Sequence, residues 1–298
     1  MKILALTTSH NRRESTVRAL ETLIRQILPP HCEMDICLVD DGCTDGTAEA
    51  VRQVVPTAIV LRGSGNLFWA GGMRFAWDTY VGRQVFDYLL VFNDDIRLCD
   101  GALAVLLKTA AELEQQACRA YAVCGALRES GSDTVAYGAV VKSSRWHPLR
   151  FRKLPPNDHI QECDTMNMNF ALISKAALAR IGFLAPDFVH AKADYDFGLR
   201  LRAQGGRVVL APGYMGQCDT NPVSRSSRAD NLSFFERWRR LTSIKEQSPR
   251  ERAIYYRRHA GLFWPIWWAG TYVRLLVEST ATGLIGRDGE RKPSDEHR

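Results

Sequence analysis

Short apolar runs recur along the first hundred residues of the chain. They lack the polar alternation of half-exposed strands, which is typical of strands that helices cover on both faces. The runs lie at residues 3–8, 35–39, 58–61 and 88–92. The pattern therefore predicts four buried strands in this part of the chain.

Segments with helical spacing separate these runs. In the first segment, residues 14–27, apolar side chains recur on one side of a helix: Val17, Leu20, Ile24 and Ile27. Further helices are expected from an N-cap at Thr44 to residue 54, and over residues 72–81. Because strands and helices alternate, we expect an α/β fold with a doubly wound, mostly parallel sheet.

The pattern is less regular after residue 100. Strands are expected at residues 121–126, 134–141, 169–173 and 207–211, and helices at 175–181 and 194–204. Residues 145–158 are rich in proline and basic side chains, and we expect a loop there. We expect an α/β domain over residues 1–220, a helical extension over 221–286 and a disordered polar tail over 287–298.

The cysteines exclude some classes of protein. Eight are present, and none forms a CxxC pair, so a structural zinc site is not expected. Cys37 and Cys124 lie in apolar runs and are interpreted as small core residues. The chain opens directly on a strand-like run without the pattern of a secretory leader, so we expect reduced thiols and a cytoplasmic location.

Positive charge is concentrated after residue 220. Residues 221–259 hold ten basic and four acidic side chains, and this excess equals the net charge of +6 of the whole chain. The uncharged stretch that follows, residues 260–273, is shorter than the roughly 20 residues of a membrane span. Two interpretations stay open: a basic, aromatic contact with a membrane surface, or helices that pack on the α/β domain.

Polar and acidic clusters follow three of the expected strands. They are Ser9-His10-Asn11-Arg12, Asp40-Asp41-Gly42 and Asn93-Asp94-Asp95. Ligands of open α/β sheets bind at the carboxyl ends of the strands, so we expect the clusters to share one edge. Each cluster alone could equally be a polar turn. Carboxylates there would suit Mg²⁺ or Mn²⁺, which bind through one or two carboxylates plus substrate phosphates.

Glycines follow the third expected strand. Gly63-Ser64-Gly65-Asn66 comes directly after it, and Gly71-Gly72 is expected to open the next helix. Glycines let a backbone approach phosphates, and a helix start favours anions. The spacing matches neither GxGxxG nor GxxxxGK[ST], which disfavours a dinucleotide site and a P-loop.

A further acidic cluster, Asp194-Tyr195-Asp196, begins an expected helix. Carboxylates at this position either cap the helix or act as a general base. Asp196 and Arg200 are spaced i, i+4, which predicts an ion pair and leaves Asp194 available for chemistry.

Together these motifs resemble the inverting glycosyltransferases of family 2, which have the GT-A fold. The most specific similarity is residues 39–47, Val-Asp-Asp-Gly-Cys-Thr-Asp-Gly-Thr, where Cys43 replaces the usual serine. Residues 65–72 resemble a segment of rhamnosyltransferase-like members, residues 92–95 occupy the place of the D-x-D motif, and residues 193–200 resemble the motif that carries the base. The resemblance covers residues 2–220, with a donor half up to about residue 100 and an acceptor half after it.

The resemblance implies metal-dependent transfer of a sugar, with rhamnose as one candidate, from a nucleotide-diphosphate donor to an acceptor hydroxyl. Asp194 would be the base, supported by Asp196 and Arg200. Asp95 would bind the divalent cation, Mg²⁺ or Mn²⁺, with Asp219 as a second candidate ligand. The expected donor-binding residues are Thr8, Asn11, Arg12, Asp40, Asp41, Gly65, Asn66, Gly71, Asn93 and Asp94.

The chain departs from the family pattern at two places. Ala193 replaces a glutamate, and residues 212–219 lack the histidine that often binds the metal, with Cys218 near that position. Members that build bacterial surface polysaccharides commonly use lipid-linked acceptors. We therefore expect a saccharide or a lipid-linked saccharide as acceptor, membrane contact through residues 221–286 at the inner face of the plasma membrane, and no nucleic acid.

Two other functions stay open. A sugar nucleotidyltransferase would carry a glycine-rich basic loop after the first strand, and residues 9–12 lack the glycines. A non-catalytic nucleotide-sugar binding protein would agree with the two departures from the family pattern.

Overall fold

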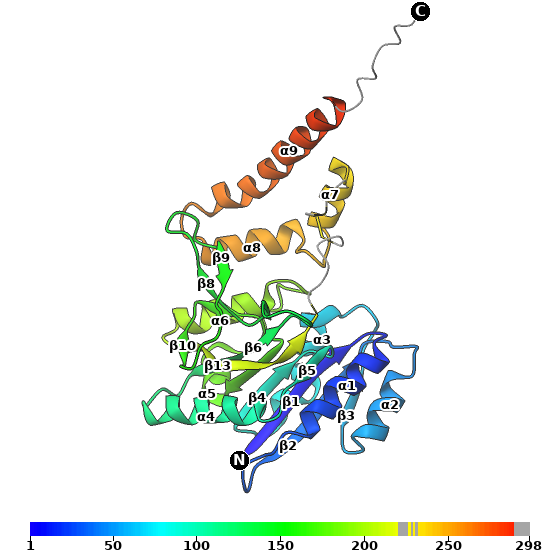
Figure 1. Ribbon diagram of the computed structural model, residues 1–298, viewed down its shortest axis with the longest axis vertical. Helices are drawn as coiled ribbons and strands as arrows, with labels where there is room; N and C mark the ends of the chain where they lie inside the picture. The colour runs from blue at the N-terminus through cyan, green and yellow to red at the C-terminus, as the bar shows by residue number, and fades with distance from the viewer. Residues whose placement is uncertain (220–225, 228, 230–231, 289–298) are drawn as a thin grey trace, which may run out of the picture. The chain divides into compact units, whose positions relative to one another are not determined.

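A computed structural model describes residues 1–219, 226–227, 229 and 232–288 (Figure 1). The chain divides into two compact units, Met1–Thr220 and Asn221–Arg298. The first unit holds every strand of the described residues, and the second is helical.

The main sheet has the strand order β10-β13-β6-β12-β4-β1-β2-β3. Its long strands are β1 (Lys2–Ser9), β2 (Glu33–Asp40), β3 (Ile59–Arg62), β4 (Tyr88–Phe92), β6 (Tyr121–Arg128), β12 (Phe170–Ser174) and β13 (Arg207–Cys218). Of the short strands, β10 (Gln161–Glu162) lies at one edge, β5 (Ile96–Leu98) pairs with one end of β13, and β7 (Val135–Tyr137) pairs with one end of β6. β3, β2, β1 and β4 are parallel to one another, as are β6 and β13, while β12 runs antiparallel to both of its neighbours. The predicted α/β class with a mostly parallel sheet is confirmed.

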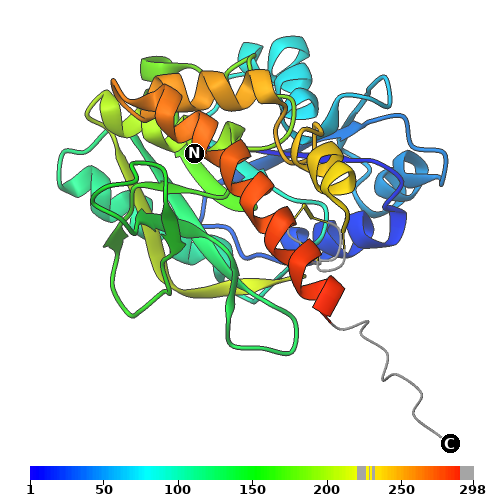
Figure 2. The same cartoon turned by 90° about the horizontal axis from the view of Figure 1, so that it is seen from above.

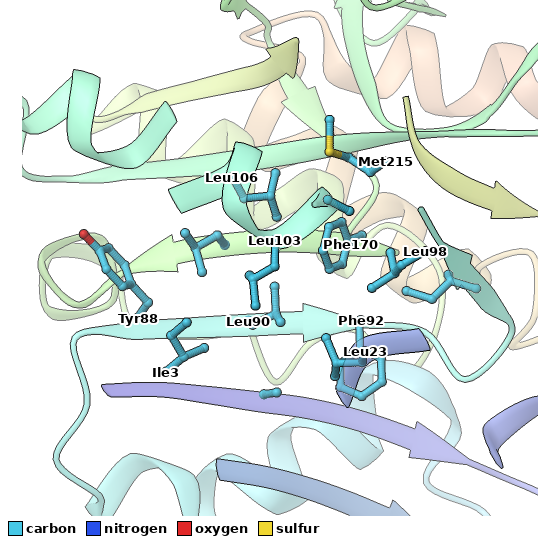
Figure 3. Close-up of a cluster of buried hydrophobic side chains, with 14 of the residues drawn as sticks. Ile3, Leu23, Tyr88, Leu90, Phe92, Leu98, Leu103, Leu106, Phe170 and Met215 are labelled. Carbon is cyan, nitrogen blue, oxygen red and sulfur yellow. The ribbon is translucent and has the colours of Figure 1, made fainter. Parts of the chain in front are cut away.

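Helices cover the sheet, and their apolar faces build the core. They are α1 (Arg13–Ile24), α2 (Thr47–Val54), α3 (Phe68–Thr79), the short 3-10 helix η1 (Val81–Arg83), α4 (Ala102–Gln115), α5 (Lys175–Ile181) and α6 (Ala193–Ala203). Figure 3 shows Leu90 and Phe92 of β4 beside Leu103 of α4 and Leu23 of α1, all fully buried. The sequence pattern did not predict α4, whereas the bounds of α5 agree with the prediction. Cys37 and Cys124 are buried core residues, as expected.

A second sheet has the order β11-β8-β9, with β8 (Ala139–Lys142), β9 (Phe151–Lys153) and β11 (Thr165–Met166). The single strand predicted over residues 134–141 is wrong, because Gly138 (φ 154°) divides it and sends β7 and β8 to different sheets. The loop predicted over 145–158 is also wrong in part, since it contains β9. This short polar strand is formed by pairing with β8, which no local pattern records.

Two helix starts differ from the prediction. α2 begins at Thr47, and the carboxylate of Asp45 accepts hydrogen bonds from the Thr47 amide and hydroxyl, so Thr44 is not the cap. α3 begins at Phe68, so Gly71 and Gly72 lie inside the helix and do not open it.

The second unit consists of α7 (Phe234–Leu241), α8 (Pro249–His259) and α9 (Trp264–Asp288). Capping boxes at Ser233 and Ser248 start α7 and α8. α9 folds back against α8 (Figure 2), and Trp268 Nε1 donates to the carbonyl of Pro249, the first residue of α8, at 3.3 Å. Among the helices described, none combines the length and the apolar character that crossing a bilayer requires. Residues 289–298 of the expected disordered tail lie outside the described residues.

Candidate active site

Asp41 organises the loop that follows β3. Its carboxylate accepts hydrogen bonds from the amides of Gly65 (2.7 Å), Leu67 (2.9 Å) and Phe68 (3.2 Å), and its side chain is buried. The last two amides belong to the start of α3, so Asp41 caps this helix from another loop. Asp41 therefore occupies three of the amides around the start of α3, where the glycine pattern suggested an anion site.

Gly42 lets the loops after β2 and β3 touch. Its φ is +67°, and a Cβ added to it would lie 2.8 Å from the Cα of Gly65. Only glycine avoids that clash between two backbones. Asn66, next to Gly65, is exposed.

The loop after β1 is tied to the loop after β2. Asn11, in the left-handed region (φ 51°), accepts from the amide of Thr44 at 2.8 Å, and His10 Nδ1 lies 2.6 Å from the carbonyl of Asp41. Asp40 accepts from the Cys43 amide at 2.7 Å. The polar residues after these two strands thus form one connected surface.

Arg12 holds the two acids that follow β4. Its Nη1 atom lies 3.2 Å from Asp94 Oδ1 and 2.8 Å from Asp95 Oδ2. Asp94 is buried, and burial raises its pKa to about 6, although Arg12 acts in the opposite direction. The side chain of Asp95 is 30% exposed, so it is the acid of this pair that a ligand can reach.

Cys218, at the end of β13, donates its S–H to Asp95 Oδ1 at 3.4 Å. Burial, followed by the charge of Asp95, raises the pKa of this thiol. Asp219 is exposed beside it. Within the part of the chain that the structure describes, no three His, Cys, Asp or Glu side chains are grouped so that they could hold a metal ion. The donor set nevertheless fits a hard ion that takes one carboxylate and completes its shell with substrate phosphates and water.

Asp194 lies in the first turn of α6 and is partly buried. Its carboxylate accepts from Asn167 Nδ2 at 3.2 Å and from the Tyr195 amide at 2.8 Å. Burial raises its pKa, and the nearby charge of Lys192 opposes that rise. Lys192 lies at φ 68°, and its Nζ sits 3.7 Å from the centre of the Tyr195 ring.

The predicted ion pair between Asp196 and Arg200 is present. Arg200 Nε donates to the fully buried Asp196 at 2.7 Å. The other guanidinium nitrogens donate to the carbonyls of Ile181 and Phe183. The pair therefore ties α6 to the end of α5 and holds the helix that carries Asp194.

Helix α3 touches both sides of this region. Trp69 Nε1 donates to Asn93 Oδ1 at 3.0 Å, next to Asp94. The amides of Ala70 and Gly71 donate to the carbonyl of Val189, in the segment that leads to Asp194. On the opposite side, Gly72 packs against Thr8 of β1. One helix thus connects the glycine loop, the acids after β4 and the segment before Asp194.

Sequence reasoning missed Trp69, Asn167 and Lys192 as members of this region. Trp69 falls within the range 65–72 but was given no role, whereas Cys218 was already noted near the expected metal ligand. Asn167 carried no local signal, because it meets Asp194 only through the pairing of β11 with β8.

A curled, mostly parallel sheet with a polar loop after β1 and acidic loops after β2 and β4 defines a GT-A type glycosyltransferase fold. Two solved structures are similar: the mannosyltransferase PcManGT from Pyrobaculum calidifontis, in complex with GDP-Man and Mn²⁺, and TarS 1–349 from S. aureus. The first has a TM-score of 0.54 at 16% identity over 96% of this chain and 79% of its own. The second has a TM-score of 0.52 at 14% identity, and the match covers 85% of this chain and 69% of the TarS chain.

The sequence profile of glycosyl transferase family 2 matches residues 5–177, and that of glycosyl transferase family group 2 matches residues 164–285. The chain belongs to glycosyl transferase family 2. A search of curated protein sequences finds no significant match.

Proposed function

We propose that the protein is an inverting glycosyltransferase that moves a sugar from a nucleoside-diphosphate donor to an acceptor hydroxyl. The observation that carries the proposal is the position of α3. Through Asp41, Trp69 and Val189 this helix joins the proposed donor loops to the segment that presents Asp194. A base and a donor site held by one rigid element suit a reaction between two bound substrates.

In the proposed reaction Asp194 accepts the proton of the acceptor hydroxyl. The acceptor oxygen forms a bond to the anomeric carbon as the bond from that carbon to the diphosphate oxygen breaks. The nucleoside diphosphate leaves with the electron pair, and attack opposite to it inverts the configuration. The raised pKa of Asp194 makes it a stronger base than an ordinary aspartate once it is ionised.

Asp95 is the residue that we propose to hold a divalent cation, with Asp219 as the second candidate ligand. When bound, Mg²⁺ or Mn²⁺ supplies positive charge that stabilises the departing diphosphate. Arg12 forms an ion pair with Asp95, and in this proposal its guanidinium also donates to the diphosphate of the donor. Asn11, Asp40, Asn66, Asn93 and Asp94 line or support the donor site in this proposal, with Asp41, Gly65, Gly71 and Thr8 shaping its backbone.

The second unit supports a lipid-linked acceptor at a membrane surface. Several large apolar side chains on α7, α9 and the turn before α9 are exposed: Phe235, Trp238, Leu262, Phe263, Ile266, Val273, Leu276 and Val277. Exposed basic residues such as Arg257 and Arg258 accompany them. This mixture is typical of helices that lie in the interface of an anionic membrane. Not all of the basic charge is available, because Arg237 is buried and donates to backbone carbonyls.

A thermal-shift panel of UDP, dTDP, GDP and CDP, each with and without Mn²⁺, tests the donor class. A nucleotide that binds the native state raises the melting temperature by mass action. dTDP is included for the rhamnose candidate, and GDP because the similar mannosyltransferase was solved with GDP-Man. If none of the four nucleotides raises the melting temperature, the result would count against the transferase.

Product analysis then separates the candidate functions. Asp194→Asn is expected to bind the donor nucleotide like the wild type and to lose transfer. Release of pyrophosphate in place of a nucleoside diphosphate would indicate a nucleotidyltransferase. Binding without transfer or donor hydrolysis by the wild type would indicate a binding protein.

A further inference from the structure

β8, β9 and the loop between them form a hairpin, residues 139–153. It supplies two strands of the small sheet and extends away from the main sheet (Figure 1). We call it the arm. It holds five lysine or arginine residues and no acidic residue, while residues 1–220 as a whole are neutral. The five are Lys142, Arg145, Arg150, Arg152 and Lys153, and all are exposed. The arm therefore carries a net charge of +5 within a unit that is neutral as a whole.

Most of this charge is not used inside the protein. Lys153 donates to the carbonyl of Val135. Of the ion pairs found in the described part of the chain, none involves Lys142 or the three arginines of the arm. Their charges face solvent and are available to an anionic surface.

Trp146 lies in the loop of the arm with 87% of its surface exposed. The loop is held by its own hydrogen bonds: the amides of Trp146 and His147 donate to Ser144 Oγ, and the Ser143 amide donates to the Arg150 carbonyl at 2.8 Å. An ordered loop thus presents a large aromatic side chain to water among cations. Tryptophan with an apolar ring and one N–H donor favours the boundary between lipid and water.

The base of the arm lies beside the proposed catalytic base. Phe151 of β9 packs edge-on against Tyr195, the neighbour of Asp194, with 5.5 Å between ring centres. β8 pairs with β11, and the chain continues directly from β11 to Asn167, which donates to Asp194. A partner bound by the arm would therefore lie on the side of the unit where the acceptor is deprotonated.

We propose that the arm docks on the surface of an anionic phospholipid membrane, with Trp146 at the interface and its cationic side chains against headgroup phosphates. Charge complementarity and the exposed indole carry this assignment. It rests on the proposed function in one respect: docking there would bring a lipid-linked acceptor to Asp194. The contact belongs to the catalytic unit and is separate from the membrane contact proposed for the second unit.

Quenching by brominated lipid gives a local test on the full chain. Vesicles of phosphatidylcholine with about 30% phosphatidylglycerol represent the anionic surface. With brominated lipids in these vesicles, the wild type is expected to lose more tryptophan emission than Trp146→Phe, because Trp146 contacts the lipid. Equal quenching of the two proteins would overturn the proposal, whatever the second unit does.

Vesicle co-sedimentation tests the charges. Arg145→Glu/Arg150→Glu is expected to weaken binding to these vesicles at least 20-fold at low salt, since each cation near the surface contributes about fivefold. Arg25→Glu/Arg119→Glu, which changes two exposed arginines of the same unit, is the matched control for net charge. Equal weakening by both pairs would contradict the proposal. The thermal shift with nucleotides is measured on the same variants. A failure of the proposed transferase function is thereby distinguished from a failure of membrane docking.

Discussion

Asp194 and Asp41 are both acids at a helix start, yet their surroundings give them different tasks. Asp41 is buried, and three backbone amides bind its carboxylate, so its role is to hold the glycine loop and α3. Asp194 is partly exposed, with a raised pKa and a lysine nearby. Lys192 and Phe68 both lie in the left-handed region (φ 68° and 57°), a conformation that costs free energy and is concentrated at functional sites.

The pH dependence of transfer follows from the pKa of Asp194. A base works in its ionised form, so kcat/KM is expected to fall as the pH drops through a pKa that burial holds above that of an ordinary aspartate. Lys192→Gln removes a charge that lowers this pKa, and it is expected to move the acid limb to higher pH. Lys175→Gln, an exposed lysine on α5, is the control and leaves the limb unchanged. If the acid limb of the kcat/KM profile lies at the same pH in Lys192→Gln as in the wild type, Lys192 does not influence the base.

At the scale of single elements, α3 is fixed on one side by packing against β1. A Cβ added at Gly72 would lie 2.5 Å from Thr8 Oγ1, whereas a Cβ at Gly71 would meet its nearest neighbour at 3.7 Å. There is therefore room for a Cβ atom at Gly71 but not at Gly72. α6 is fixed differently, through the buried pair of Asp196 and Arg200.

Alanine substitutions at the two glycines test the packing of α3. Gly72→Ala is expected to destabilise the protein by about 1–3 kcal/mol, because the helix or β1 has to shift. Gly71→Ala is expected to be neutral or to stabilise by up to about 1 kcal/mol, since alanine is the better helix former. Urea unfolding measures both, and equal effects would show that the contact with Thr8 does not constrain the helix.

Breaking the pair on α6 tests the support of Asp194. Arg200→Gln removes the opposite charge that pairs with a fully buried carboxylate, and a loss of about 3 kcal/mol in the free energy of unfolding is expected. Arg128→Gln is the matched control. Its partner Asp133 is 95% exposed, so less than about 1 kcal/mol is expected there. If the two variants melt alike, the pair has no structural role.

At the scale of the whole molecule, the proposed donor site is assembled from strands whose order in the sheet differs from their order in the chain. Asp95 follows β4, and Cys218 ends β13, 123 residues later, yet their side chains meet. Arg12 reaches the same acids from the loop after β1. The proposed metal and diphosphate site thus depends on the complete sheet.

Asp95→Asn tests the metal at this site. The variant is expected to lose the part of the nucleotide thermal shift that depends on Mn²⁺ and to keep the part seen without metal, because it lacks the carboxylate that we propose to hold the ion. In the wild type, nucleotide at 100 times its Kd stabilises the native state by about 2.7 kcal/mol. The same Mn²⁺-dependent shift in the variant would place the metal elsewhere.

The sequence by itself determined the features that depend on neighbours along the chain. Apolar runs predicted the four parallel strands β1 to β4, the local pattern predicted the bounds of α5, and the i, i+4 spacing predicted the pair of Asp196 and Arg200, because helices and strands bring near neighbours together with a known period. Only the tertiary structure decided that Asp41 caps α3, that Asn167 contacts Asp194, and that residues 139–153 form a hairpin. These contacts depend on strand order and register, which are selected by burial across the whole sheet and leave no period in the local pattern.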